Sequence, residues 1–296
     1  MDYRQFSVAH ATRLLDRLAF QMNAAARSHT PEVVHDLRVA VRRFSQALAI
    51  GKPCFPARGV KKMRRRVKAV MSRAGAVRDC DIALKLVSGS KAADAGAIEA
   101  KLRARSAEGR KILAASLGRF TSGSLVSKWS RILQECATAA PIQTTVEDVA
   151  RRKLVRLAAT FLREGQRAAA RKASATQMHH VRLAAKKLRY TLELFSEVYG
   201  EAAADWVEQL RQMQILLGRI SDCSVTRRLV EEMGGSAEMV AALESRQKRK
   251  AREFRRAWKE GAERVNDCIH AFERPPHKPL GRAALERAAA RGSASA

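Results

Sequence analysis

The 296-residue chain is 46% hydrophobic but only 5% aromatic, a composition that favours packed helices and argues against a β-sheet protein. Its 57 Lys and Arg residues outnumber 29 Asp and Glu residues, which gives a formal net charge of +28 spread over both halves of the chain. A folded body this cationic attracts polyanions, so the candidate partners are nucleic acid, polyphosphate or an anionic surface.

Helical periodicity runs from Tyr3 almost to the end of the chain and predicts an all-α fold. Thr30, Pro31 and Glu32 provide a helix cap, a first-turn proline and an acid at the positive helix end. Near the end of the chain, Pro275, Pro276 and Pro279 break the pattern, so we expect a weakly ordered basic tail over 273–296. In chain order, helices are expected near 3–28, 31–50, 57–74, 77–88, 94–117, 122–138, 144–171, 175–199, 202–217, 221–233 and 237–271.

Two short motifs each occur twice along the chain. HDLRVAVRRF (35–44) returns as HHVRLAAKKL (179–188), and GAVRDC (75–80) returns as GRISDC (218–223). The offsets are 144 residues (35 to 179) and 143 residues (75 to 218), so an internal duplication is indicated. We therefore predict one domain made of two repeats, each an antiparallel bundle of about four helices, with the bundles related by an approximate two-fold axis. The domain spans 1–272, with repeats at about 1–140 and 144–272.

The helices at 31–50 and 175–199 place cations beside a histidine, on the side opposite their apolar residues. An ordinary solvated helix face would explain these rows of cations only if acids balanced them, because like charges one turn apart repel. No acid occurs between Asp36 and Asp79 or between Glu164 and Glu193. The polar faces, which we expect to point away from the bundle cores, carry His35, Arg38, Arg42 and Gln46 in the first copy and His179, Arg182, Lys186, Arg189 and Tyr190 in the second.

The helix expected at 57–74 contains the densest basic run, KKMRRRVK (61–68). Such runs often serve as localisation signals or disordered arms. Here an apolar stripe that includes Met63, Val67 and Val70 passes through the run, which favours a folded amphipathic helix. Lys61, Arg64, Arg65 and Lys68 then form a cationic stripe beside it.

Asp79 and Asp222 follow the second motif in each repeat and have two interpretations. We favour caps on a following helix over metal ligands, because a carboxylate is stabilised by the exposed amides of a helix N-terminus. His35 and His179 show no metal-ligand spacing either. Each histidine lies among cations, so we expect a lowered pKa and the uptake of a proton when an anion binds.

The residue types on these faces match phosphate better than nucleic-acid bases. Arg donates two parallel hydrogen bonds to phosphate and stays charged, while Lys supplies a mobile point charge. Readers of single-stranded bases need stacking aromatics, and only Tyr190 stands within the basic segments. No Walker, zinc-protease or nucleophile-elbow motif occurs, so we predict neither catalysis nor a cofactor or metal.

The ordered set of motifs resembles the CHAD family, the conserved histidine α-helical domain. The matching segments are VHDLRVAVRRF (34–44), GAVRDCDI (75–82), MHHVRLAAKKLRYTLELF (178–195) and LRQMQILLGRISD (210–222). The resemblance spans nearly the whole chain. It implies two helical bundles around a basic central cleft that binds inorganic polyphosphate, in a stand-alone domain without a fused catalytic one.

The resemblance and the basic run together predict the residues that line this cleft. The second repeat is less cationic, because Ala204, Glu208 and Ser221 stand where the first has Lys61, Arg65 and Arg78, so a lopsided cleft is expected. The predicted lining residues are His35, Arg38, Arg42, Arg43, Lys61, Arg65, Lys68, Arg78, His179, Arg182, Lys186, Lys187, Arg189 and Arg211.

The leading hypothesis is a non-catalytic polyphosphate-binding protein, which the resemblance also associates with polyphosphate granules. A nucleic-acid-binding protein that uses the same basic surface is the alternative, and an enzyme acting on phosphate esters or a structural scaffold are weaker ones. The basic stretch 246–259 is either a second docking surface or solvated. With no apolar run that could span a bilayer and no signal-peptide pattern, we expect a cytoplasmic protein without membrane insertion.

Overall fold

A computed structural model describes residues 2–28, 30–121 and 124–273, and within them it is all-α, as predicted. The predicted tail lies almost wholly outside the described residues. The helices are α1 (Tyr3–Arg27), α2 (Pro31–Ile50), the short 3-10 helix η1 (Lys52–Cys54), α3 (Ala57–Val87), α4 (Ala95–Thr121), α5 (Leu125–Ala137), α6 (Val146–Ala169), α7 (Ala175–Leu194), α8 (Ser196–Tyr199), α9 (Glu201–Glu232) and α10 (Ala237–Glu273).

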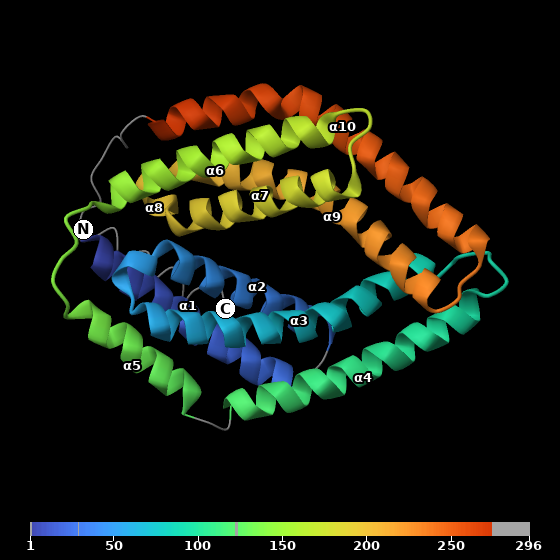
Figure 1. Ribbon diagram of the computed structural model, residues 1–296, viewed down its shortest axis with the longest axis horizontal. Helices are drawn as coiled ribbons and strands as arrows, with labels where there is room; N and C mark the ends of the chain where they lie inside the picture. Colours follow the sequence, from blue (N-terminus) through green and yellow to red (C-terminus); the bar gives the residue numbers. More distant parts are fainter. Residues whose placement is uncertain (1, 29, 122–123, 274–296) are drawn as a thin grey trace.

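The two repeats form two four-helix bundles with the same order of contacts. In the first, α1 packs on α2, α2 on α3, α3 on α4, and α4 back on α1. In the second, α6, α7, α9 and α10 close the same cycle. Figure 1 shows the bundles one above the other, with α2 and α7 facing each other between them. The equivalent helices α2 and α7, and likewise α3 and α9, also contact each other and so join the repeats. Only α5, which packs on α1, lacks a counterpart of similar length among the described helices.

Apolar residues at helical spacing build two cores. The larger runs through both bundles and contains the predicted inner faces of α2 (for example Leu37 and Phe44) and of α7 (for example Val181 and Leu188). The smaller lies where the α3–α4 and α9–α10 connections meet, around Val87 and Val230. Full burial of one large aliphatic side chain stabilises the fold by about 1.5–3 kcal/mol. The burial of these side chains therefore fixes how the bundles sit against each other.

Local signals set several helix ends, including the start at Thr30 and Pro31 that the sequence predicts. The Thr30 hydroxyl accepts a hydrogen bond from the Val33 amide, with Pro31 in the first turn of α2. Ser174 and Gln177 form a reciprocal capping box at the start of α7. Gly200 and Gly234 adopt φ values of 59° and 73°, in the left-handed region that glycine enters without strain. These residues stop or separate helices without help from distant parts of the chain.

Two predicted helix breaks are wrong. The segments 57–74 and 77–88 form the single helix α3, and 202–217 and 221–233 form the single helix α9. Gly75 and Gly218 thus lie inside helices, where glycine costs about 1 kcal/mol relative to alanine. Packing of α3 and α9 along their whole length offsets that cost. At Gly75 a Cβ atom would meet an Arg38 guanidinium nitrogen at 2.9 Å, so the glycine makes room for this side chain.

Candidate functional site

The contacts of α2 with α7 and of α3 with α9 bring the two copies of both motifs together at the centre of the molecule. Arg38 and Arg182, at matching positions of the first motif, are largely buried and close enough for their charges to act on each other. Burial and then the Arg42 charge lower the pKa of Arg38 to about 10, whereas Asp79 opposes the shift. Burial also lowers the pKa of Arg182, with Asp222 opposing. Each central arginine therefore has a carboxylate of the second motif near it.

Asp79 and Asp222 do not cap helices, contrary to the prediction. Because α3 and α9 are continuous, both residues lie in mid-helix, where the backbone amides are already bonded. Burial raises the pKa of both carboxyl groups, and Arg38 and Arg182 are the first charges that counter it for Asp79 and Asp222 respectively. The two aspartates therefore balance the buried arginines.

Lys186 is the most perturbed cation of the second repeat. Burial, followed by the charges of Arg182 and Arg42, lowers its pKa to about 7. A lysine with this pKa is only partly protonated near neutral pH, and any anion placed beside it favours the charged form. The side chain also lines a pocket, so its charge is available to a ligand.

Arg38, Arg182, Asp79 and Asp222 form the charged centre of the molecule. His35 and His179 flank this charged centre, and both side chains are exposed. The pKa of each is lowered, as predicted, but partial desolvation of the otherwise exposed ring is the larger cause and the neighbouring cations come second. Arg78 and Arg42 act on His35, and Arg182 acts on His179. Arg78 therefore also belongs to the charged centre, next to the first histidine.

A pocket of about 890 Å³ opens between α2, α3 and α7. None of its lining residues, all in the described part of the chain, is acidic. Its apolar parts come from Val41, Met71 and Leu183, with Tyr190 at one side. The cations that line it are Arg42, Arg58, Lys61, Lys62, Arg64, Arg65, Lys68, Lys186 and Lys187.

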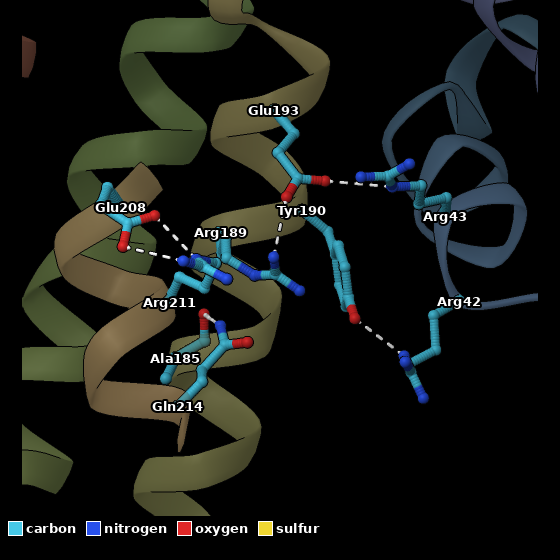
Figure 2. A network of polar contacts seen from close by, with 9 residues as sticks. All are labelled: Arg42, Arg43, Ala185, Arg189, Tyr190, Glu193, Glu208, Arg211 and Gln214. Atoms are coloured by element: carbon cyan, nitrogen blue, oxygen red, sulfur yellow. Dashed lines mark hydrogen bonds and ion pairs between the residues drawn. The ribbon is translucent and has the colours of Figure 1, made fainter. Parts of the chain in front are cut away.

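Hydrogen bonds between α2 and α7 hold the two repeats in register beside this pocket. The Arg42 Nε donates to the Tyr190 hydroxyl at 2.8 Å, and its guanidinium carbon lies 5.8 Å from the ring centroid (Figure 2). The Gln46 amide donates to the Thr191 hydroxyl at 2.7 Å. Arg42 is thus oriented by a residue of the other repeat while its remaining guanidinium donors stay available.

Three predicted lining residues belong neither to this pocket nor to the charged centre. Arg43 and Arg189 bind the two oxygens of Glu193, at 3.2 and 3.1 Å, and Arg211 binds Glu208 at 2.7 Å (Figure 2). The prediction treated these arginines as uncompensated. Arg189 and Arg211 each pair with a carboxylate within four residues on their own helix, whereas Arg43 pairs with a carboxylate on the facing helix α7. Glu193 is thus shared by Arg43 and Arg189, whereas Glu208 balances Arg211.

The remaining predicted residues divide between the two parts of the site. Arg42, Lys61, Arg65, Lys68, Lys186 and Lys187 line the pocket, whereas Arg38, Arg78, Arg182 and the two histidines belong to the charged centre. Arg58, Lys62 and Arg64 line the pocket but were not among the predicted site residues. The sequence did carry a signal for Lys62 and Arg64, because both belong to the basic run of α3.

Other kinds of site find no support among the described residues. None of the helices there has a stretch of the length and hydropathy that crossing a bilayer requires. Nor does that part of the chain gather three or more His, Cys, Asp or Glu side chains in a metal-binding group.

Comparisons with known proteins agree with this architecture. The crystal structure of the CHAD domain from the plant Ricinus communis superposes with a TM-score of 0.70 at 23% identity, covering 94% of each chain. PptA from Streptomyces chartreusis gives a TM-score of 0.62 at 15% identity, over 89% of this chain and 100% of that one. Among curated proteins no relative matches. The sequence model of the CHAD domain matches residues 9–231, and the chain therefore belongs to the CHAD family.

Proposed function

We propose that the protein binds inorganic polyphosphate, without catalysis, in the pocket between α2, α3 and α7. The observation that carries the proposal is the set of nine Lys and Arg side chains that surround about 890 Å³ with no acid among the lining residues. Like charges gathered in this way repel each other, and a polyanion relieves the repulsion. A linear chain with about one negative charge on each phosphate fits an elongated array of cations from both repeats.

The charged centre adds donors to this array. The Arg182 Nε is buried and has no hydrogen-bond partner among the described residues. An unsatisfied buried donor costs about 1–3 kcal/mol, which an anionic oxygen within reach would recover. Lys186, with its pKa near 7, gains its full charge when an anion is close.

The pocket suits phosphate better than bases. Tyr190 is its only aromatic lining residue within the described chain, and the side chain is 6% exposed with its hydroxyl bound to Arg42. Single-strand binders stack bases on open aromatic faces, which this ring does not offer. The lining cations also come without a carboxylate that could hold magnesium, the usual partner of phosphoryl transfer.

Competition binding tests the proposal directly. Fluorescently labelled DNA or RNA is bound at physiological salt, and unlabelled long-chain polyphosphate is added at matched total charge. We expect polyphosphate to displace the nucleic acid, with a log affinity that falls against log salt by about 0.7 for each phosphate bound. Nucleic acid that stays bound in excess polyphosphate would favour the alternative function, and release of inorganic phosphate during incubation would indicate an enzyme.

The same proposal places the protein at polyphosphate granules in cells that form them. A fluorescent fusion should collect at granules, and the fusion that carries Lys61→Glu and Lys68→Glu should be diffuse. Both changes lie at exposed positions of α3 that line the pocket. Equal granule labelling by the two fusions would contradict this part of the proposal.

A further inference from the structure

A second hollow, of about 850 Å³, lies beside the pocket described above, between α2, α6 and α7. The two share Gln46, Leu183 and Lys187 in their linings, so they adjoin along the line where α2 meets α7. Lys187 is exposed and faces both hollows. A linear ligand that passes Lys187 therefore contacts the lining of both hollows.

Three cations of α6, none of them among the predicted site residues, line the second hollow: Arg152, Lys153 and Arg156. Arg152 and Arg156 are exposed and lie one turn apart, with Lys153 half-buried beside them. Burial, then the charges of Arg156 and Arg152, lower the pKa of Lys153, and no carboxylate counters the shift. As in the first pocket, these cations repel each other, and here the Lys153 side chain is half-buried in the lining.

The nearby acids are already engaged elsewhere. The Asp148 carboxylate accepts from the Thr145 hydroxyl at 2.9 Å and from Arg151 at 3.4 Å, whereas Arg152 reaches only the Asp148 backbone carbonyl, at 3.3 Å. Glu164 is the only acid in the lining of the second hollow, which consists of described residues, and it binds Arg167 at 3.3 Å. Among the described residues neither carboxylate forms an ion pair with Arg152, Lys153 or Arg156, although the Arg152 charge acts on Asp148.

At this hollow the second repeat is the more cationic one, whereas in the comparison of α3 with α9 the first repeat is. At the offset of 144 residues that relates the first motifs, Arg152, Lys153 and Arg156 correspond to Val8, Ala9 and Thr12 of α1. The first repeat thus contributes the cations of α3 to one hollow, and the second contributes those of α6 to the other. Together they form one cationic track across the α2–α7 junction.

We propose that polyphosphate bound in the first pocket continues past Lys187 into the second, where Arg152, Lys153 and Arg156 hold a further stretch of the same chain. This inference rests on the proposed function and deepens it, because the second hollow makes the protein selective for long chains. A chain too short to reach beyond Lys187 gains nothing from α6. A long chain binds α6 as well without a second association step, in the manner of a linked ligand.

The test compares tripolyphosphate with long-chain polyphosphate on the full-length protein and on an Arg152→Gln, Lys153→Gln, Arg156→Gln variant. The matched control is Arg249→Gln, Arg252→Gln, Arg256→Gln, which removes the same charge from exposed positions of α10. We expect the α6 variant to bind the long chain about tenfold more weakly, with a salt slope shallower by about 0.7 for each phosphate that α6 no longer binds. Its affinity for tripolyphosphate should stay within about twofold of the parent, as should both affinities of the control.

Circular dichroism and thermal unfolding establish that the variants are folded. If the half-buried Lys153 proves necessary for folding, the pair Arg152→Gln and Arg156→Gln at exposed positions replaces the triple change. An unchanged long-chain affinity, or an equal weakening for tripolyphosphate and the long chain, would overturn the inference while leaving the proposed function intact. If the parent protein binds neither ligand, the proposed function itself fails.

Discussion

The N-terminal halves of α3 and α9 hold equivalent places in the two bundles but carry different charges. Lys61, Arg65 and Lys68 of α3 line the pocket, and no acid lies among its lining residues. At the offset of 143 residues, α9 has Ala204, Glu208 and Arg211, and the last two form an ion pair at 2.7 Å. One helix thus offers unpaired cations to a ligand, and the other neutralises its own.

Several buried positions of the same two helices have kept similar apolar side chains. Val67, Val77 and Cys80 of α3 correspond to Leu210, Ile220 and Cys223 of α9, and all six side chains are buried. Substitution at a core position is constrained in size and polarity, because a cavity or an unpaired polar group there costs several kcal/mol. An exposed position has no such limit. The comparison therefore locates the charge difference between the two copies in exposed side chains of one scaffold.

The largest expected effect comes from reversing the charges on α3. In the variant Lys61→Glu, Arg65→Glu, Lys68→Glu, three attractions to the ligand become repulsions. At about 1 kcal/mol or more for each reversal, polyphosphate should bind at least about a hundredfold more weakly. Isothermal titration calorimetry measures the weakening, and far-UV circular dichroism should be unchanged because all three residues are exposed.

Arg211→Glu on α9 is the control for the Lys68→Glu part of this change. It alters an exposed cation at the position equivalent to Lys68, but one that lies outside the pocket and is held by Glu208. Its effect on polyphosphate affinity should stay below about threefold, the size of a surface ion-pair change. A weakening comparable with that of the α3 variant would mean that binding depends on net charge and not on the pocket.

A smaller effect follows from the pKa of Lys186. This pKa is about 7 in the protein, and an anion favours the protonated form, so each binding event above that pH takes up a proton. We expect polyphosphate affinity to fall about tenfold between pH 7 and pH 8.5, the response of one linked proton. Lys186→Arg should flatten the profile in this range, because arginine remains charged. The same flat profile in the unmodified protein would contradict the assignment.

Stability should respond to pH with the opposite sign. The pKa of Lys186 is lowered from its ordinary value of 10.5 to about 7, so between these values the unfolded chain binds more protons at this residue than the folded one. The contribution of Lys186 to the free energy of unfolding therefore rises with pH through that window. The slope of thermal stability against pH should be smaller in Lys186→Met, which cannot titrate.

The sequence predicts the fold better than it predicts the site, for physical reasons that particular residues show. Apolar periodicity located the helices and buried faces, since residues such as Leu37 and Val181 have one environment that satisfies them. Gly75 misled the prediction, because it serves the close approach of Arg38 and not a helix end. Likewise, Asp79 has the chemistry of a cap, and only the packing of α3 against its neighbours shows that it faces a buried arginine.

Charge pairing across helices was the part least accessible from the sequence. A run of cations without acids between Glu164 and Glu193 pointed to α7, but Glu193 itself binds both Arg43 of α2 and Arg189. Conversely, Arg152 and Lys153 occur in an ordinary amphipathic helix, and only the packing of α6 on α7 places them beside the pocket. Whether a cation is available depends on distances that sequence spacing does not contain.

The smallest expected effect tests the comparison from the other side, by giving α9 the charges of α3. In the variant Ala204→Lys, Glu208→Arg, the acid that holds Arg211 is removed and two cations are added at exposed positions. If the difference between the repeats lies in these side chains and not in the backbone, the second repeat gains weak affinity of its own. We expect total binding to strengthen about threefold, because new exposed cations contribute about 0.2–1 kcal/mol each. The gain should survive in the α3 charge-reversal variant, since positions 204 and 208 lie outside the pocket that α3 lines. If it vanished there, the added cations would be acting only through the pocket of the first repeat.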